Sequence, residues 1–313
     1  MSPPPRTVTT RAPTRIDFGG GWTDVPPYCE REGGFVCNVA ITRYAMATIT
    51  QGSPVPTDRD DLLVKAAVRR SGLSNVRLTV SNDFPVGAGL GGSSAASAAV
   101  LGALAAWKDE PWNRRDIAEL GRVIEVEDLG VAGGRQDHYA ATHGGALALT
   151  FTDTVDAQPI AMSANTRTEL ERRALVVYTG QSRISGDTIT AVLGAYLERD
   201  RRVCNALREM KRLASEMATV LARGDLDHLG ALVEEHWSSQ RALNSAIPTP
   251  LIDEIIARAA KAGAHGSKAL GASGGGCVLV IAGAENVDSV RRAVEDLGTV
   301  LEFAVDSDGL TLC

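Results

Sequence analysis

A glycine-rich segment that leads into an alanine-rich stretch constrains this chain more than any other feature. Residues 85–96 read PVGAGLGGSSAA, with Gly87, Gly89 and Gly91 at alternate positions. Glycine permits a positive φ and a close approach of the backbone to a ligand, and the alanines favour a helix over residues 95–106. A glycine loop at a helix N-terminus directs free N–H groups at one point. The segment therefore predicts a phosphate-binding loop, and the competing interpretation is a tight turn before a buried helix.

The segment is not a Walker A loop. That motif needs a Lys-Ser/Thr pair after its last glycine, whereas Gly92 is followed here by Ser93 and Ser94. The two hydroxyls are candidate ligands for a phosphate or for Mg²⁺.

Composition and charge exclude several classes of protein. The chain has 313 residues, enough for two domains, and its 44% hydrophobic and 22% charged residues are typical of a globular protein. The net charge of −6 argues against a nucleic acid or an anionic membrane as the main partner. The five scattered cysteines lack metal-ligand spacing, and we find neither a signal peptide nor a membrane-spanning run. A cytoplasmic protein with reduced thiols is expected.

Local patterns predict strands and helices in both halves of the chain, and hence an α+β fold. Strands are expected at residues 35–42, 44–50, 76–80, 144–150, 174–178, 278–282 and 300–305. Helices are expected at 62–70, 95–106, 115–127, 186–244 with a break near Gly224, 249–262 and 287–297. Residues 1–10 are expected to be frayed, with loops at 52–60 and 130–137. The polar stretch 151–170 predicts a boundary between one domain at 1–170 and another at 171–313.

Three motifs together resemble those of the GHMP kinases, the family of galactokinase, homoserine kinase, mevalonate kinase and phosphomevalonate kinase. The second motif, P-x-x-x-G-L-x-S-S-A, is matched by Pro85, Gly89, Leu90, Ser93, Ser94 and Ala95, with one extra glycine. Residues 12–24, APTRIDFGGGWTD, resemble the first motif, and residues 271–280, GASGGGCVLV, resemble the third. The resemblance implies the two-domain GHMP kinase fold. Its N-terminal domain is like domain 2 of ribosomal protein S5, its C-terminal domain is ferredoxin-like, and the active site lies between them.

The resemblance implies roles for three residues on the acceptor side. Asp137, in GGRQDHYAA, matches the catalytic aspartate that receives the proton of the attacking hydroxyl. Arg15 matches the arginine beside it, whose fixed charge lowers the pKa of a neighbouring group. Asp24 matches the aspartate that binds sugar hydroxyls. Without the resemblance, both aspartates would be interpreted as turn residues and Arg15 as a surface ion-pair partner.

On the donor side, the resemblance implies that the loop wraps the phosphates of ATP, through Pro85, Gly87, Gly89, Leu90, Gly91, Gly92, Ser93 and Ser94. Ser94 and Glu125 are expected to hold Mg²⁺, which takes few protein oxygens besides phosphates and water. Ser93 and Glu127 are the alternatives. Gly274 and Gly275 of the third motif are expected to support the phosphate loop, unless they serve only a tight turn.

Departures from the galactokinase pattern bear on the substrate. Galactokinases carry G-E-H-T-D, whereas this chain carries G-G-W-T-D with Trp22, which argues against galactose. That form, followed by Pro-Pro, is similar to fucokinases. The segments TGQSR and GAHGSKALGASGGG are similar to D-glycero-D-manno-heptose 7-phosphate kinases, with Arg183 and Lys268 as candidate cations for a sugar phosphate. Each of these two is equally readily a solvated surface charge.

The sequence thus predicts an ATP- and Mg²⁺-dependent kinase that phosphorylates the anomeric hydroxyl of a sugar or sugar phosphate. The heptose 7-phosphate type is preferred because the chain is of modest length, and a fucokinase-type enzyme is the alternative. A non-catalytic sugar sensor is disfavoured because Asp137, Arg15, Ser94 and Glu125 are all retained. A mevalonate-pathway or homoserine kinase is disfavoured by the sugar-like G-G-W-T-D. Self-association as a homodimer is left open.

Overall fold

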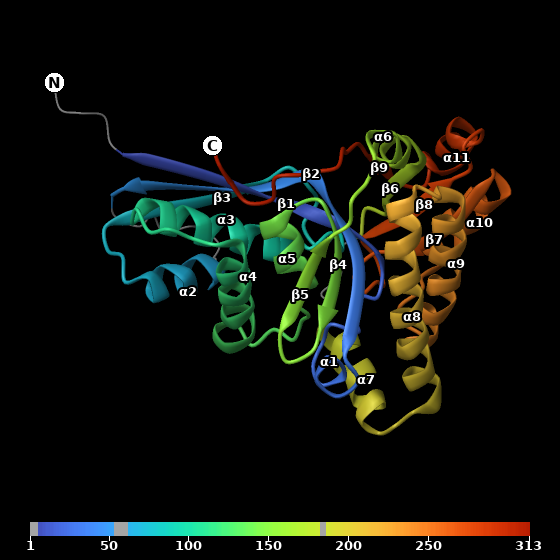
Figure 1. The fold of residues 1–313 in the computed structure, drawn as a ribbon, viewed down its shortest axis with the longest axis horizontal. Helices are drawn as coiled ribbons and strands as arrows, with labels where there is room; N and C mark the ends of the chain where they lie inside the picture. The colour runs from blue at the N-terminus through green and yellow to red at the C-terminus, as the bar shows by residue number, and fades with distance from the viewer. Residues whose placement is uncertain (1–5, 53–61, 182–185) are drawn as a thin grey trace.

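A computed structural model describes residues 6–52, 62–181 and 186–313, which form two sheets with helices packed against them (Figure 1). The mixture of sheets and helices in both halves confirms the predicted α+β class. No helix within these ranges combines the length and apolarity needed to cross a membrane.

The first sheet is antiparallel and is built on two long strands, β1 (Thr7–Gly19) and β2 (Gly34–Gln51). Its order is β10-β1-β2-β4-β5, with β3 also paired to β2. The shorter strands are β3 (Val76–Asn82), β4 (Ala146–Phe151), β5 (Val155–Pro159) and β10 (Thr311–Leu312). Residues 7–10 pair with residues 47–50, so the expectation of a frayed start was wrong there. Their β-branched side chains favour a strand.

Helices of the first half cover this sheet. The alanine-rich α3 (Gly92–Trp107) is longer than expected and packs on β1 and β2. The expected helix at 115–127 is α4 (Arg114–Val123), continued by the π-helical turn η1 (Ile124–Asp128). The remaining helices are α1 (Tyr28–Glu32), α2 (Leu62–Ser71) and α5 (Gln136–His143). Residues 53–60 of the expected loop at 52–60 lie outside the described residues.

The second sheet has the order β7-β8-β6-β9, from β6 (Ala174–Tyr178), β7 (Ala264–Ala269), β8 (Cys277–Ala282) and β9 (Thr299–Leu301). Its helices are α6 (Ala164–Arg173), α7 (Gly186–Leu197), α8 (Arg201–Arg223), α9 (Leu226–Leu243), α10 (Pro250–Lys261) and α11 (Val287–Val294). The expected break near Gly224 is present, whereas the break before α8 and strand β7 were not expected. The Asp200 side chain caps α8 by accepting from the Val203 amide.

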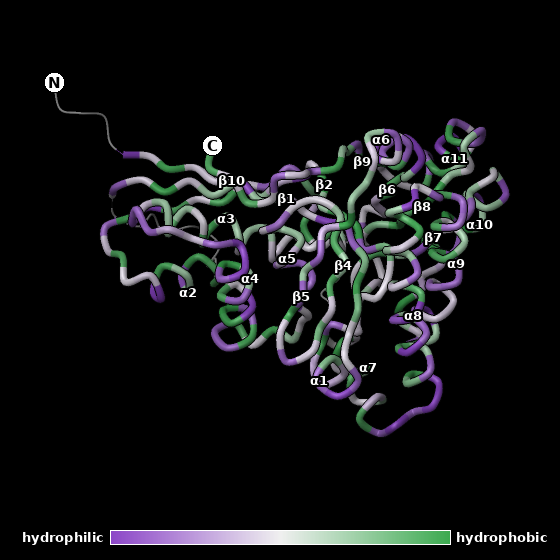
Figure 2. Tube along the Cα trace, in the orientation of Figure 1, coloured by the Kyte–Doolittle hydropathy of each residue, from purple (hydrophilic) through white to green (hydrophobic). Residues whose placement is uncertain are grey.

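Helix α8 and the end of the chain both join the two halves. Polar and apolar residues alternate along α8 (Figure 2), and α8 packs on both β1 and β2 of the first sheet. The end of the chain also returns to that sheet, where β10 pairs with β1 and Val305 bridges to Ile41. The proposed division at residue 170 lies just before the change of sheet at β6, but the last residues belong to the first sheet.

Candidate active site

A cleft of about 810 Å³ lies where the first-half helices meet the second half. Its lining residues come from four segments, 15–25, 82–96, 125–137 and 270–275, and from α7. Three of these segments carry the motifs that the sequence singled out. A cleft of this size falls within the range of small-molecule sites. The geometry therefore brings distant motifs to one place.

The phosphate loop has the backbone that its glycines predict. Gly87, Gly89 and Gly91 have φ between 73° and 75°, a backbone conformation that residues with a side chain rarely adopt. A Cβ on Gly89 would lie 2.6 Å from the Leu270 carbonyl oxygen, so only glycine fits this approach. No side chain caps the N-terminus of α3, whose first turn holds Ser94. Its free amide groups suit an anion.

The third motif packs directly against this loop. The Cys277 amide donates to the Ala88 carbonyl oxygen at 2.8 Å. Gly275 lines the cleft, whereas the Gly274 amide donates to Ile247 behind it, at 2.9 Å. These contacts fit a supporting role for residues 271–276, of which 271–273 and Gly275 line the cleft.

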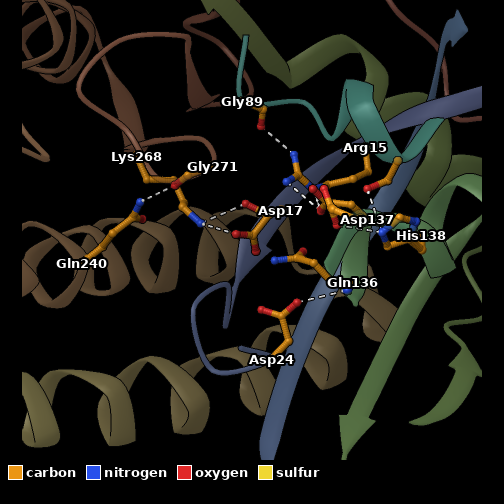
Figure 3. Close-up of polar contacts among 12 residues, drawn as sticks. Arg15, Asp17, Asp24, Gly89, Gln136, Asp137, His138, Gln240, Lys268 and Gly271 are labelled. Carbon is orange, nitrogen blue, oxygen red and sulfur yellow. Dashed lines mark hydrogen bonds and ion pairs between the residues drawn. The ribbon is translucent and has the colours of Figure 1, made fainter. Parts of the chain in front are cut away.

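Arg15 and Asp137 form an ion pair beside the phosphate loop (Figure 3). The Arg15 Nε donates to Asp137 Oδ1 at 2.8 Å, and its Nη1 donates to the Gly89 carbonyl oxygen at 2.6 Å. Arg15 is buried on β1, and its own amide donates to Leu90 of the loop. The pair therefore joins the acceptor-side aspartate to the loop expected to hold phosphate.

The carboxyl of Asp137 is in an environment that makes it a better proton acceptor. Burial raises its pKa above the ordinary value, and the neighbouring charge of Arg15 opposes that shift. Asp137 lies in the first turn of α5, whereas the sequence predicted a loop through residue 137. It nevertheless lines the cleft, with about a quarter of its side chain exposed to solvent.

The two expected metal ligands converge on a histidine. Glu125 Oε2 lies 3.0 Å from the His138 Nε2, and Ser94 Oγ lies 3.4 Å from the same nitrogen. Glu125 sits in η1, where a π-helical turn often marks a functional position. Glu127, the alternative, points to Arg70 instead. A role for His138 was not predicted, since it has no motif of its own.

This donor set fits a magnesium ion. Ser94 and Glu125 both line the cleft, and both supply oxygens close to the same histidine, His138. Mg²⁺ needs few such oxygens, because phosphates and water complete its shell. Among the described residues, no group of three or more His, Cys, Asp or Glu side chains could hold a metal ion without such help. Ser93, the other alternative, lines the cleft and is exposed.

Asp24 and Trp22 lie at the other end of the cleft, both buried. Trp22 has a φ of 80°, a strained conformation of the kind that clusters at functional sites. Asp24 Oδ2 accepts from the backbone amide of Gln136 at 3.0 Å (Figure 3). Burial, the largest cause, raises the pKa of Asp24 to about 6, despite that hydrogen bond.

Lys268 does not lie where a substrate phosphate could reach it. Its side chain is fully buried, and its Nζ donates to the backbone oxygen of Asp17 at 3.0 Å and to Asp17 Oδ2 at 3.3 Å (Figure 3). The expected direct contact with a sugar phosphate is therefore wrong, because β7 carries Lys268 behind the cleft wall. Arg183, the other candidate cation, lies outside the described residues.

Comparison with known proteins agrees with this geometry. The chain matches the GHMP kinases N terminal domain over residues 61–145 and the GHMP kinases C terminal domain over residues 217–299. It is 27% identical to a D-glycero-alpha-D-manno-heptose 7-phosphate kinase of Campylobacter jejuni, over 97% of this chain and 98% of that protein. It is also 27% identical to a bifunctional fucokinase/GDP-fucose pyrophosphorylase of Arabidopsis thaliana, over 99% of this chain but 33% of that longer protein.

A solved structure shares the whole fold. The crystal structure of a D-glycero-D-manno-heptose 1-phosphate kinase from Bacteroides thetaiotaomicron superimposes with a TM-score of 0.78, at 27% identity and 98% coverage of both chains. The two domain matches together span more than half of the chain. The chain thus belongs to the GHMP kinases, phosphotransferases that use ATP as the phosphate donor.

Proposed function

We propose that this enzyme transfers the γ-phosphoryl group of ATP to the anomeric hydroxyl of a sugar, with a heptose 7-phosphate as the preferred class of substrate. The ion pair between Arg15 and Asp137, held against the carbonyl of Gly89, is the observation that carries the proposal. It places a carboxylate with a raised pKa beside the phosphate loop. Relatives named as heptose phosphate kinases and a fucokinase support a sugar as the acceptor.

The roles of the residues follow from their positions. The acceptor hydroxyl oxygen attacks the γ-phosphorus, the bond from that phosphorus to the oxygen of ADP breaks, and the hydroxyl proton passes to Asp137. Arg15 keeps Asp137 ionised before the transfer and orients it. Phosphate oxygens are held by the amides of the loop and of the α3 N-terminus. Ser94 and Glu125 would hold Mg²⁺, which would neutralise phosphate charge.

The choice between a free sugar and a sugar phosphate as substrate depends on whether an arginine or lysine side chain is available to bind the phosphate. Among the described residues that line the cleft, Arg15 is the only arginine or lysine. Its guanidinium already donates to Asp137 and to the Gly89 carbonyl oxygen. A dianionic 7-phosphate needs a charged donor, so the preferred substrate relies on Arg183. A free sugar such as fucose needs no such donor, which makes a fucokinase-type activity the second candidate.

A substrate panel tests the proposal. The purified enzyme is incubated with ATP, MgCl₂ and each of D-glycero-D-manno-heptose 7-phosphate, L-fucose, D-galactose and D-mannose, and ADP release is followed. Phosphorus and carbon NMR then locate the new phosphate. We expect the heptose 7-phosphate to be phosphorylated fastest, at its anomeric carbon. A new phosphate at another carbon, or sugar binding without ADP release, would refute the anomeric kinase. Faster turnover of free fucose would change the proposed substrate to a free sugar and would leave the proposed anomeric kinase activity in place.

A further inference from the structure

The wall opposite the phosphate loop contains a carboxylate that the motifs did not single out. Asp17 lies on β1, two residues from Arg15, and lines the cleft with only 4% of its surface exposed. Its Oδ1 has no hydrogen-bond partner among the residues that the structure describes. A buried acceptor without a partner is rare in folded proteins. The neighbouring Gln136, also lining the cleft, has an unpartnered Oε1 by the same criterion.

Lys268 fixes this carboxylate in place. The lysine reaches from β7 of the second sheet and holds both the backbone oxygen and Oδ2 of Asp17 (Figure 3). Burial lowers the pKa of Lys268, and the nearby Asp17 opposes that shift. A carboxylate has about four acceptor sites in total, and Lys268 occupies one of them. Asp17 is thus held rigidly, with most of its accepting capacity unused.

Gly21 lies directly against this carboxylate. A Cβ on Gly21 would lie 2.4 Å from Asp17 Oδ2 and 3.0 Å from Gln136 Nε2, so a side chain there would displace both groups. Gly21, Asp17 and Gln136 all line the cleft. Gln136 extends between Asp17 and Asp24 (Figure 3). This wall of the cleft therefore carries two carboxylates, which accept hydrogen bonds from hydroxyls, and an amide, which can also donate them.

We infer that Asp17 is a sugar-binding and specificity-determining residue, which accepts a hydrogen bond from a substrate hydroxyl on its unpartnered Oδ1, while Lys268 positions it through Oδ2. The inference rests on the proposed sugar kinase activity. Asp17 and Asp24 would then accept hydrogen bonds from different hydroxyls of one sugar. Two carboxylates on this wall also repel an anion, so a substrate phosphate lies away from Asp17 and Asp24.

The test compares variants with the sugar that the wild-type enzyme phosphorylates fastest in the panel above. Asp17→Asn weakens the acceptor, and Gly21→Ala places a Cβ against Asp17 Oδ2 and Gln136 and so displaces the acceptor. Asp306→Asn is the matched control, because Asp306 is an equally buried aspartate outside the cleft whose oxygens accept from Tyr44 and two backbone amides. KM for the sugar, KM for ATP, kcat and the calorimetric affinity for the sugar alone are measured.

We expect both cleft variants to weaken sugar affinity about 10- to 100-fold, as for loss of a charged hydrogen bond, with ATP affinity within twofold of wild type. Asp306→Asn should change neither. Removal of one particular hydroxyl from the sugar should lower the affinity of the wild type by the same factor. The same removal should not lower the affinity of Asp17→Asn any further. Should Asp17→Asn fail to fold, Gly21→Ala decides the question.

Two negative outcomes are distinct. If the wild type phosphorylates a sugar but Gly21→Ala binds it with unchanged affinity, the role of Asp17 is refuted and the kinase stands. If the wild type phosphorylates no sugar in the panel, the proposed function fails, and the assignment of Asp17 fails with it.

Discussion

Replacement of Asp24 by asparagine should stabilise the protein at neutral pH while it weakens sugar binding. Asp24 is buried, and its carboxyl accepts a hydrogen bond from the Gln136 amide. Burial, together with the charges of Asp137 and Asp17, raises its pKa from 3.8 to about 6. Asparagine keeps an oxygen for the Gln136 amide but has no charge to bury.

The size of the effect follows from the pKa. A shift from 3.8 to about 6, at about 1.4 kcal/mol per unit, corresponds to about 3 kcal/mol. Because the folded-state pKa is raised, the stabilising contribution of Asp24 is fully present below pH 3.8 and is lost as the pH rises through about 6. We therefore expect Asp24→Asn to be more stable than wild type by up to about 3 kcal/mol at pH 8, and the gain to vanish near pH 4.

Urea unfolding from pH 4 to pH 8, without sugar or ATP, measures this difference. Sugar KM at pH 8 is measured alongside, and it should rise in Asp24→Asn because a neutral amide is a weaker hydroxyl acceptor than a carboxylate. A variant that is less stable than wild type at pH 8, or a gain that does not change with pH, would contradict the reasoning.

Four further substitutions test other residues expected at the site. Ser94→Ala and Glu125→Gln should each raise the Mg²⁺ concentration for half-maximal activity about tenfold, and a Mg²⁺ titration identical to wild type for both would exclude this metal site. Arg183→Ala should raise KM for a sugar phosphate about 10- to 100-fold with little change for ATP, whereas an equal effect on both would place its charge elsewhere. Gly91→Ala, at a φ of 73° and with a Cβ 3.0 Å from Asp137 Cγ, should lower kcat in single-turnover assays; an unchanged rate would show that Asp137 tolerates displacement.

Much of the fold and part of the site could be predicted from local sequence. The glycine loop and the alanine helix were predicted because propensity and packing agree there, and α3 is buried along most of its length. Strand β7 was not predicted, because residues 264–269, AHGSKA, lack the β-branched pattern of a strand. Pairing with β8 and packing against α9 impose its conformation.

The contacts that shape the sugar end could not be predicted, since they join residues far apart in the chain. Asp17 and Lys268 are 251 positions apart, and only the folded sheets bring them together. Lys268 was therefore interpreted as a cation for the substrate when it is a buried partner of Asp17. The link from Ser94 through His138 to Glu125 likewise joins three helical segments, and no single segment signals it.

The central claim is that Asp137 receives the proton of the attacking hydroxyl. Its most direct test is single-turnover phosphoryl transfer by Asp137→Asn at saturating sugar and ATP, with ATP affinity measured by calorimetry on the same protein. Asparagine preserves an oxygen to accept from Arg15 but cannot take up the proton. We expect a rate about 10²- to 10⁴-fold below wild type, with ATP affinity retained. A rate within a few-fold of wild type would contradict it.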